Sequence, residues 1–382
     1  MSRKQIRSLS SRTRELLNKA SAARIPVSGT FELTPMCNFD CKMCYVRKSP
    51  GEVRAHPRSM VTYDQWMEIA RQAREEGLLY LLLTGGEPFI WPDFWKLYEQ
   101  LIRMGFLISL NSNGSLIDEE AILRLRELPP TRINITLYGA SDETYEVLCG
   151  AKNVFSRIDR AITGLMEAGI QVKLNCSLTP HNAHDLKKIV AYAKEKDLIL
   201  QVSTYMFPPL RRDPSMVGTN ERFTPEQMAY YQMRQFSYQQ GEEIYREYLQ
   251  QIMQGNAVPL GLDDSCADSM DGKIRCRAGN ASFWITWDGW MTPCGMMTGP
   301  KAELNGRTFR EAWEDTVAAC DAMVLSTACQ KCPTRHMCHS CAAAAMAETG
   351  STAEIPKYLC HMVQEMQKIA AKQLATGNYA GP

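Results

Sequence analysis

The chain has 382 residues, and its 43 Lys and Arg nearly balance its 42 Asp and Glu, which leaves a net charge of +1. This balance provides no field for nucleic acid or anionic lipid, and we find neither a membrane-length apolar run nor a secretory signal. The 14 cysteines lie mostly in short clusters, which in a long chain indicates metal ligation in a reducing cytoplasm rather than disulfides.

The first elements are a basic helical extension and a strand. Residues 1–27 carry seven Lys or Arg and a narrow leucine stripe, as expected of a solvated helix. The apolar run 27–33 predicts the first strand, and a cysteine-containing loop follows it. Residues 48–60 read as a polar loop. Thr62 and Gln65 form a capping-box pattern, which predicts a helix that ends near Gly77.

Strands and helices then alternate along the chain. The predicted strands cover residues 78–84, 106–111, 132–137, 170–177 and 198–204. The predicted helices cover residues 92–104, 118–128 and 183–196, and one more ends near Gly169. Such alternation predicts an α/β fold with a parallel sheet and helices outside it. Ligands of such folds gather at the carboxyl ends of the strands.

The remaining chain breaks this pattern. A loop rich in proline and arginine follows Tyr205, and residues 224–254 read as one aromatic-rich helix. The segment 285–293 reads as a β-hairpin with an Asp-Gly turn, and a helix is expected over 309–325. The predicted organisation is an extension (1–27), a barrel (28–204), a bridging segment (205–255), a cysteine-rich domain (256–365) and a tail (366–382).

Three cysteines follow the first strand at the spacing C-x₃-C-x₂-C, namely Cys37, Cys41 and Cys44. A short loop can turn three thiolates toward one centre, and an iron–sulfur cluster with three protein thiolates keeps one iron open. The alternatives are three small buried side chains or half of a zinc site. Zinc sites favour paired C-x₂-C units, which Cys37 does not join.

This spacing resembles the signature of radical S-adenosylmethionine (radical SAM) enzymes, which fold as a partial (β/α)₆ barrel. The resemblance implies a [4Fe–4S] cluster whose open iron binds S-adenosylmethionine, and cleavage of that cofactor to a 5′-deoxyadenosyl radical. The motif Gly85-Gly86-Glu87-Pro88 ends the second strand and matches a family motif that binds the methionyl amino group. The other cofactor contacts that the resemblance implies are Met43, Tyr45, Ser112, Asn113, Thr136 and Asn175.

The C-terminal cysteines resemble the SPASM domain that follows some radical SAM barrels. The chain reads C-x₁₂-G-x₄-C from Cys276 to Cys294, and then C-x₂-C-x₅-C-x₂-C from Cys329 to Cys341, with the last gap one residue shorter than in the family pattern. By this resemblance two auxiliary [4Fe–4S] clusters are expected, which makes three in all. Their ligands would be Cys266, Cys276, Cys294 and Cys341 for one, and Cys329, Cys332, Cys338 and Cys360 for the other. The two C-x₂-C pairs leave structural zinc as the alternative.

The resemblance implies a peptide maturase, which abstracts hydrogen from a peptide or protein and leaves a crosslink or an oxidised side chain. A separate recognition protein and an electron donor such as flavodoxin or ferredoxin are the expected partners. Oxidation or rearrangement of a small molecule is one alternative, and a non-catalytic iron–sulfur or zinc scaffold is another. The candidate catalytic residues, chosen for their place near strand ends or the second domain, are Tyr138, Tyr205, Arg211, Asp263 and Asp264.

Overall fold

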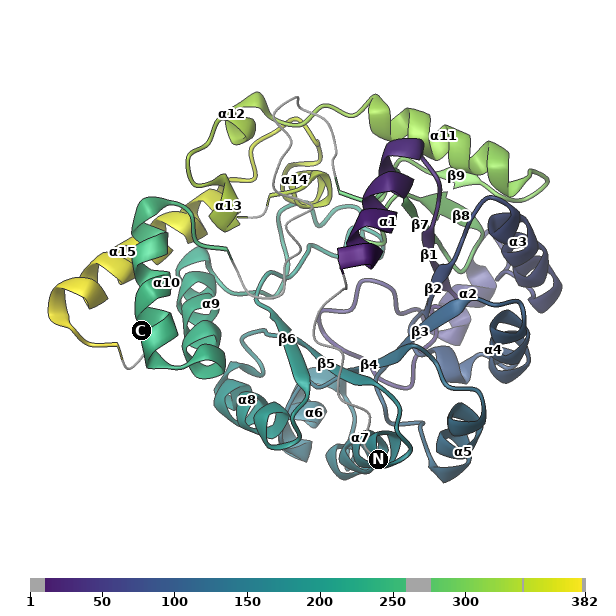
Figure 1. Ribbon diagram of the computed structural model, residues 1–382, viewed down its shortest axis with the longest axis horizontal. Coiled ribbons are helices and arrows are strands. Elements are labelled where there is room, and N and C mark those ends of the chain that lie inside the picture. Colours follow the sequence, from purple (N-terminus) through teal and green to yellow (C-terminus); the bar gives the residue numbers. More distant parts are fainter. Residues whose placement is uncertain (1–10, 259–275, 339, 380–382) are drawn as a thin grey trace. The chain divides into compact units, whose positions relative to one another are not determined.

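The computed structural model describes residues 11–258, 276–338 and 340–379 (Figure 1). Its described strands form one sheet in the order β6-β5-β4-β3-β2-β1-β7-β8-β9. Strands β1 to β6 run parallel in the α/β partial barrel that the sequence predicts. Their bounds are β1 Ser28–Glu32, β2 Tyr80–Thr84, β3 Leu107–Ser112, β4 Arg132–Thr136, β5 Val172–Ser177 and β6 Ile199–Ser203.

Helices alternate with these strands. The helices of this part of the chain are α1 Ser11–Ala23, α2 Pro50–Ala55, α3 Tyr63–Glu75, α4 Phe94–Arg103, α5 Glu119–Glu127, α6 Asp142–Cys149, α7 Phe155–Glu167 and α8 Leu186–Glu195, with short 3₁₀ turns η1 Pro88–Ile90 and η2 Ala183–Asp185. The capping box of Thr62 and Gln65 begins α3 as predicted. The polar loop predicted over 48–60 is wrong in part, because Ser49 and Glu52 form a second capping box and start α2.

The parallel strands have two unlike faces. In β3 and β4 the fully buried side chains Ile108, Leu110, Ile133 and Ile135 alternate with half-buried or exposed ones. Figure 1 shows α3, α4 and α5 outside strands β2 to β4. Because successive residues of a strand point to opposite faces, the buried aliphatic side chains face these helices. The intervening side chains, which include Ser109 and Asn111 of β3 and Asn134 of β4, therefore lie on the inner face of the barrel.

The predicted hairpin forms and joins the barrel sheet. Strand β7 (Ser282–Ile285) pairs antiparallel with β8 (Trp290–Thr292), and β8 pairs with the short β9 (Ala302–Glu303). Strand β7 also pairs in parallel with β1, with Ser28 opposite Ser282 and Phe31 opposite Ile285. Helix α11 (Phe309–Asp321) follows, beginning at Thr308. The hairpin therefore continues the sheet beyond the edge that β1 would otherwise leave unpaired.

The described chain divides into two compact units. Of the described residues, the first contains 11–137, 141–174 and 277–322, and the second contains 138–140, 175–258, 276, 323–338 and 340–379. In the second unit, α9 (Pro225–Gln240), α10 (Glu242–Gln254) and α15 (Lys357–Thr376) pack together. The single helix predicted over 224–254 is wrong, because Gly241 has φ 87° and separates α9 from α10.

A buried ion pair connects two segments of the second unit. Arg222, in the segment before α9, pairs with Glu348 of α14 (Ala342–Thr349), and both side chains are nearly inaccessible. Tyr205 also donates its hydroxyl to Glu348, and the Arg222 guanidinium lies 3.8 Å from the ring centroid of Tyr358. A buried charge needs such partners, so this network connects the bridging segment to the C-terminal helices.

Candidate active site at the carboxyl ends of the barrel strands

The loop after β1 carries the three N-terminal cysteines, and the second strand's motif holds that loop. Gly86 donates its backbone N–H to the Thr34 carbonyl at 2.7 Å, and Glu87 donates to the Met36 carbonyl at 2.9 Å. A methyl group on Gly86 would lie 2.3 Å from the Met36 oxygen, so only glycine permits this approach. Gly85 has φ 155° and is equally close to Thr34. The two motifs therefore form one packed unit.

Glu87 occupies the centre of this unit and is fully buried. Its carboxylate accepts hydrogen bonds from the Ser112 hydroxyl at 2.9 Å, the Asn113 backbone N–H at 2.8 Å and the Phe89 backbone N–H at 3.3 Å. Burial raises the pKa of Glu87 to about 7, although these three donors act in the opposite direction. The carboxylate thus joins the second strand's motif to the turn after β3.

Asn113 carries the connection on to the cysteine loop. Its side-chain nitrogen donates to Asn38 Oδ1 at 2.9 Å and lies 3.7 Å from Cys37 Sγ. Its side-chain oxygen accepts hydrogen bonds from the backbone and hydroxyl of Ser115. Cys37, Glu87 and Asn113 come from three separate loops, and the hydrogen bonds bring them into contact at the carboxyl ends of β1, β2 and β3.

The three thiols are half-buried and interact with one another. Burial raises the pKa of Cys37 to about 12, and the charges of Glu87, Cys41 and Cys44 add to the increase. A hydrogen bond with Cys149 and burial raise the pKa of Cys41 well above its usual value. Without a metal ion, the thiols of Cys37 and Cys41 would stay protonated at neutral pH. A metal that coordinates these sulfurs would displace their protons.

The donor set fits an iron–sulfur cluster. Among the residues that the structure describes, no three His, Cys, Asp or Glu side chains converge closely enough to hold a single metal ion. A cubane cluster presents a separate iron to each thiolate, so its ligands need not meet at one point. Cys37, Cys41 and Cys44 share one short loop, and the adjacent N–H groups of Phe39 and Arg47 already point at two of the sulfurs, Cys37 and Cys44.

The other predicted cofactor contacts lie as follows. Met43 and Tyr45 are half-buried on the cysteine loop, and the buried Pro88 begins η1. Thr136 is the last residue of β4 on its inner face. Asn175 lies near the end of β5 in the second unit, and its buried side-chain oxygen has no hydrogen-bond partner among the described residues. Each is thus at or near the strand end where the sequence predicts it.

The catalytic candidates are not brought together. The hydroxyl of Tyr205 bonds to Glu348, and burial raises its pKa well above the usual value, with Glu348 adding to the shift. The backbone oxygen of Tyr138 accepts a hydrogen bond from Asn182, and Arg211 is half-buried in the bridging loop. Asp263 and Asp264 lie outside the described residues. No acid or base therefore stands out among the described candidates.

Four C-terminal cysteines of the second unit interact. Burial raises the pKa of Cys338 to about 11, and the charges of Cys360, Cys329 and Cys332 add to the increase. Cys329 lies on α12 (Thr327–Gln330) and Cys338 ends α13 (Arg335–Cys338), while Cys360 lies in the first turn of α15. These four residues, from three helices and the loop between two of them, lie near enough for their charges to interact, and their grouping as cluster ligands stays a prediction.

The other predicted auxiliary ligands are placed individually. Cys341 caps the N-terminus of α14, where its sulfur accepts the Ala344 N–H at 3.5 Å, and a helix N-terminus favours a thiolate. Cys276 is half-buried in the second unit, and Cys294 is half-buried in the first. Cys266 lies outside the described residues. None of the thirteen cysteines in the described part of the chain forms a disulfide.

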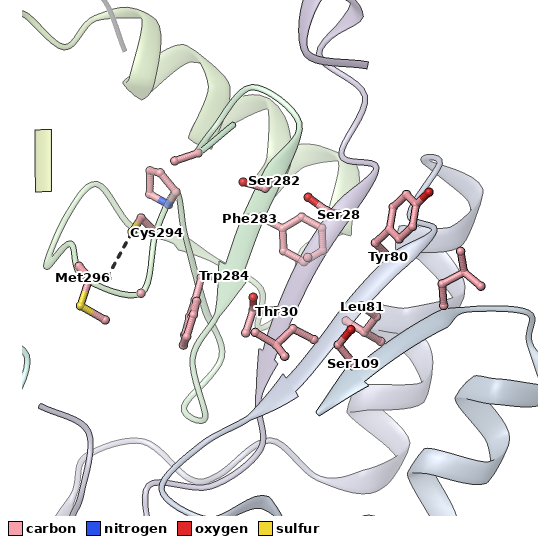
Figure 2. Close-up of a pocket in the computed structure, with 16 residues that line it drawn as sticks. Ser28, Thr30, Tyr80, Leu81, Ser109, Ser282, Phe283, Trp284, Cys294 and Met296 are labelled. Atoms are coloured by element: carbon pink, nitrogen blue, oxygen red, sulfur yellow. Dashed lines mark hydrogen bonds between the residues drawn. The ribbon is translucent and has the colours of Figure 1, made fainter. Parts of the chain in front are cut away.

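A cavity of about 380 Å³ opens beside Cys294 in the first unit. Figure 2 shows Thr30 of β1, Ser109 of β3, Trp284 of β7 and Cys294 around it. The Trp284 indole donates a hydrogen bond of 2.9 Å to the buried Glu32 carboxylate at the end of β1. The cavity therefore lies against the inner face of the sheet, with a predicted cluster ligand in its wall.

The structure adds residues that the sequence pattern did not indicate. Asn38 and Ser115 complete the hydrogen bonds around Asn113, and Arg157 of α7 donates to the Ser115 carbonyl at 2.7 Å. Cys149, at the end of α6, is buried and hydrogen-bonded to Cys41. Its backbone oxygen accepts the Asp40 N–H at 2.8 Å, so the end of α6 is hydrogen-bonded to the cysteine loop. In the sequence, the polar character of Asn38 and Ser115 was the one feature that could have indicated their place in this hydrogen-bonded unit.

Comparisons with known proteins agree with this geometry. Residues 31–193 match the model of the Radical SAM superfamily. The AdoMet-dependent heme synthase of Methanosarcina barkeri is 24% identical over 333 residues, which cover 86% of this chain and 94% of that protein.

No helix in the described residues has the length and apolar character of a membrane span.

Solved structures share the fold over nearly the whole chain. Native anSMEcpe with bound AdoMet superposes with a TM-score of 0.68 at 20% identity, covering 92% of this chain and 99% of that one. Streptococcus suis SuiB bound to its precursor peptide SuiA superposes with a TM-score of 0.64 at 16% identity, covering 94% of this chain and 84% of that one. At these identities the likeness establishes the fold.

Proposed function

Because residues 31–193 of this chain match the model of the Radical SAM superfamily, we propose that it abstracts a hydrogen atom from a peptide or protein substrate and leaves a crosslink or an oxidised side chain. The observation that carries the proposal is the hydrogen-bonded unit of Cys37, Glu87 and Asn113 at the strand ends. The cluster and S-adenosylmethionine together supply the 5′-deoxyadenosyl radical when bound. An enzyme, rather than a non-catalytic scaffold, is therefore the interpretation that we retain.

The protein's own residues provide position and shielding. Cys37, Cys41 and Cys44 would hold the cluster, and Gly85 and Gly86 would bring backbone carbonyls close to the cofactor's ammonium group. The Glu87 carboxylate already accepts three hydrogen bonds inside the protein, so its part is to fix Ser112 and Asn113. Thr136 and Asn175 would contact the cofactor's ribose or carboxylate from the inner face of the barrel.

The C-terminal cysteines would hold two auxiliary clusters. Burial and then the charges of neighbouring cysteines, Cys332 among them, raise the pKa values of Cys329, Cys338 and Cys360, which supports one of them. Cys276, Cys294 and Cys341, with Cys266, would hold the other. An auxiliary cluster could take up an electron from the substrate radical. Flavodoxin or ferredoxin would supply electrons to the barrel cluster.

The peptide substrate is supported by the fold of SuiB, which was solved with a precursor peptide. A second candidate is oxidation of a small molecule, which the heme synthase relative favours because the match covers 94% of that protein. Incubation of the reduced enzyme with S-adenosylmethionine and either candidate precursor peptides or a porphyrin, followed by mass spectrometry, separates the two. A loss of hydrogen from the peptide supports the first, and a mass change confined to the porphyrin supports the second.

Formation of 5′-deoxyadenosine tests the radical step itself. The wild-type protein should form it when reduced, and the triple variant Cys37→Ala, Cys41→Ala, Cys44→Ala should not. Cys320→Ala is the matched control, because this buried cysteine of α11 contacts Gly279 and belongs to no predicted cluster. Equal 5′-deoxyadenosine formation by the triple variant would show that the assigned loop is wrong.

A further inference from the structure

The end of helix α6 is docked on the cysteine loop on both sides of Cys41. The backbone N–H of Asp40 donates to the carbonyl of Cys149 at 2.8 Å, and the backbone N–H of Lys42 donates to that of Leu148 at 3.1 Å. Both segments belong to the first unit. Because the two donors flank Cys41, the backbone of Cys41 runs alongside the last turn of α6.

Two further contacts hold the loop on the helix. The ring of Phe39 meets the ring of Tyr145 edge-on, with the centroids 6.2 Å apart. Gly150 ends α6 in the left-handed conformation with φ 62°, and a methyl group there would lie 3.6 Å from Asp40 Cβ. The separation of the loop from the helix is therefore set by contacts that involve no sulfur atom.

The sulfur of Cys41 meets a second sulfur in this contact. Cys41 and Cys149 are hydrogen-bonded to each other. The sulfurs of Cys37 and Cys44 instead accept backbone N–H groups of the loop itself, each at 3.3 Å. A disulfide forms between cysteines whose backbones lie close together, and its two sulfurs approach to about 2.05 Å. With the backbones already hydrogen-bonded, side-chain rotation can supply this approach.

The two cysteines differ in their access to solvent. Cys41 is half-buried on the loop, whereas Cys149 is fully buried at 0% exposure. An oxidant in solution therefore reaches Cys41 first. An accessible thiol with a second thiol beside it is typical of a redox-responsive site, because the second thiol converts the oxidised first one to a disulfide.

We propose that Cys41 and Cys149 form a reversible disulfide when the loop carries no cluster and a disulfide oxidant is present, so that the end of α6 is a redox switch on cluster assembly. The proposal rests on the proposed function, because that function makes Cys41 a cluster ligand. In the disulfide, Cys41 has no thiolate to give to iron, and the loop keeps only Cys37 and Cys44 as ligands. The bond also protects Cys41 from irreversible oxidation to the sulfinic and sulfonic acids.

The oxidant is a low-molecular-weight disulfide such as glutathione disulfide. The sulfur of Cys41 attacks it, which breaks its S–S bond, releases one glutathione and leaves a mixed disulfide on Cys41. The sulfur of Cys149 then attacks the Cys41 sulfur and releases the second glutathione. The two cysteines thus lose two protons and two electrons, and one glutathione disulfide becomes two glutathiones. Excess thiol reverses both steps.

Peptide mapping of the whole chain, before cluster insertion, tests the disulfide. The protein is incubated with glutathione disulfide, its free thiols are blocked under denaturing conditions, and it is digested with trypsin without a reductant. The tryptic peptides are residues 25–42 and 133–152, and fragmentation of the linked pair distinguishes Cys41 from Cys37 in the first. We expect a pair linked through Cys41 that disappears after treatment with dithiothreitol. Because the raised pKa of Cys41 leaves little thiolate at neutral pH, the exchange is followed over hours.

Single variants separate the two steps. Cys149→Ala lacks the second sulfur and should accumulate the glutathione adduct on Cys41. Cys41→Ala should leave Cys149 as a free thiol, because the oxidant does not reach a buried sulfur. Cys320→Ala is the matched control, since this cysteine of the same unit is also buried, at 2% exposure, and its loss should leave the wild-type linked pair. Circular dichroism melting shows whether each variant is folded.

Cofactor binding measures the consequence of the disulfide. After oxidation and removal of the oxidant, reconstitution should yield about tenfold fewer S-adenosylmethionine sites in calorimetry than the reduced protein gives. Treatment with dithiothreitol before reconstitution should restore them. After peroxide treatment, dithiothreitol should restore at least about threefold more sites in wild type than in Cys149→Ala, in which Cys41 is oxidised irreversibly.

The proposal is overturned if oxidised wild type contains no linked pair, if the link runs through Cys37, or if the oxidised protein recovers as many S-adenosylmethionine sites as the reduced protein. Formation of 5′-deoxyadenosine keeps the switch separate from the radical function. A reconstituted protein that forms 5′-deoxyadenosine but shows no linked pair would contradict the switch alone. A protein that forms the linked pair but no 5′-deoxyadenosine would contradict the proposed function and leave the disulfide standing.

Discussion

The backbone N–H of Asn113 donates a hydrogen bond of 2.8 Å to the carboxylate of Glu87, 26 positions earlier in the chain. Asn113 in turn approaches the sulfur of Cys37. A buried carboxylate thus connects the turn after β3 to the loop that would hold the cluster. A substitution at any one of these three residues should therefore change the positions of the other two.

Glu87→Gln should destabilise the fold. Both carboxylate oxygens accept hydrogen bonds, and an amide replaces one acceptor by a donor that would face an N–H or O–H group. We expect a loss of about 1–3 kcal/mol in the free energy of unfolding. Urea denaturation under anaerobic conditions measures it. The exposed Glu127→Gln on α5 should change little, and an equally stable Glu87→Gln would refute the account.

Glu87 should also make stability depend on pH. Burial raises its pKa to about 7 from 4.5, so the folded protein holds this proton more tightly than the unfolded chain does. The free energy of unfolding should therefore fall as pH rises from about 4.5 through 7, by up to roughly 3 kcal/mol. The slope is measured as wild type minus Glu87→Gln. A flat difference across this range would contradict an elevated pKa.

Gly86→Ala should displace the cysteine loop. The added methyl would lie 2.3 Å from the Met36 backbone oxygen, closer than any real contact, so the loop must move. We expect reduced iron content after reconstitution and a loss of S-adenosylmethionine binding, measured by iron assay and calorimetry. Gly51→Ala on α2 is the control, because the added methyl meets only Ser49 at 3.9 Å. Full iron and cofactor binding in Gly86→Ala would argue against close packing of the two motifs.

Cys149→Ala should lower the reduction potential of the barrel cluster. The hydrogen bond with Cys149 raises the pKa of Cys41, so Cys41 is the donor while its thiol is protonated. Once Cys41 binds iron as a thiolate, the S–H of Cys149 would donate to that sulfur, and such a bond stabilises the reduced, more negative cluster. An EPR-monitored redox titration should give a more negative potential for Cys149→Ala, with Cys149→Ser intermediate because it keeps a donor. The buried Cys320→Ala should match wild type. An unchanged reduction potential in Cys149→Ala would show that Cys149 contributes only to packing against the cysteine loop.

Glu348→Ala should strongly destabilise the second unit. The change leaves the guanidinium of Arg222 buried without its carboxylate, which costs about 3–5 kcal/mol. Thermal unfolding followed by circular dichroism measures the loss. The exposed Asp315 of α11 pairs with Arg307, which precedes that helix. Asp315→Ala should therefore lower the free energy of unfolding by less than about 1 kcal/mol. Comparable losses of thermal stability in the two variants would show that burial of the Arg222–Glu348 pair does not increase the cost of removing its carboxylate.

Local patterns predicted the barrel, because apolar or alternating strand segments are followed in turn by loops and helical segments along the chain. Thr62 with Gln65, and the Gly85-Gly86 turn, could be read directly. The short helix α2 was missed because Pro50 and Gly51 look like loop residues unless the Ser49–Glu52 pair is recognised. The break at Gly241 was missed because aromatic side chains continue on both sides of it.

Relations across strands could not be read from the sequence. Asn111 and Asn134 are 23 positions apart, and only the register of β3 with β4 brings their side chains into contact. The contact of Cys149 with Cys41 depends on where α6 ends, which no motif marks. The parallel pairing of β1 with β7 joins distant segments whose side-chain patterns carry no information about each other. The periodicity of apolar residues predicts individual helices and strands, whereas the packing of the whole chain determines which strands pair.

The pairing of β1 with β7 has a consequence for biosynthesis. Ser28 contacts Ala281, and 253 positions separate them, so the edge of β1 is bare until most of the polypeptide has left the ribosome. At ~5–20 residues per second this interval is ~13–50 s. An uncovered strand edge invites pairing with other chains. A nascent or truncated product that stops before β7 should therefore aggregate unless a chaperone covers it.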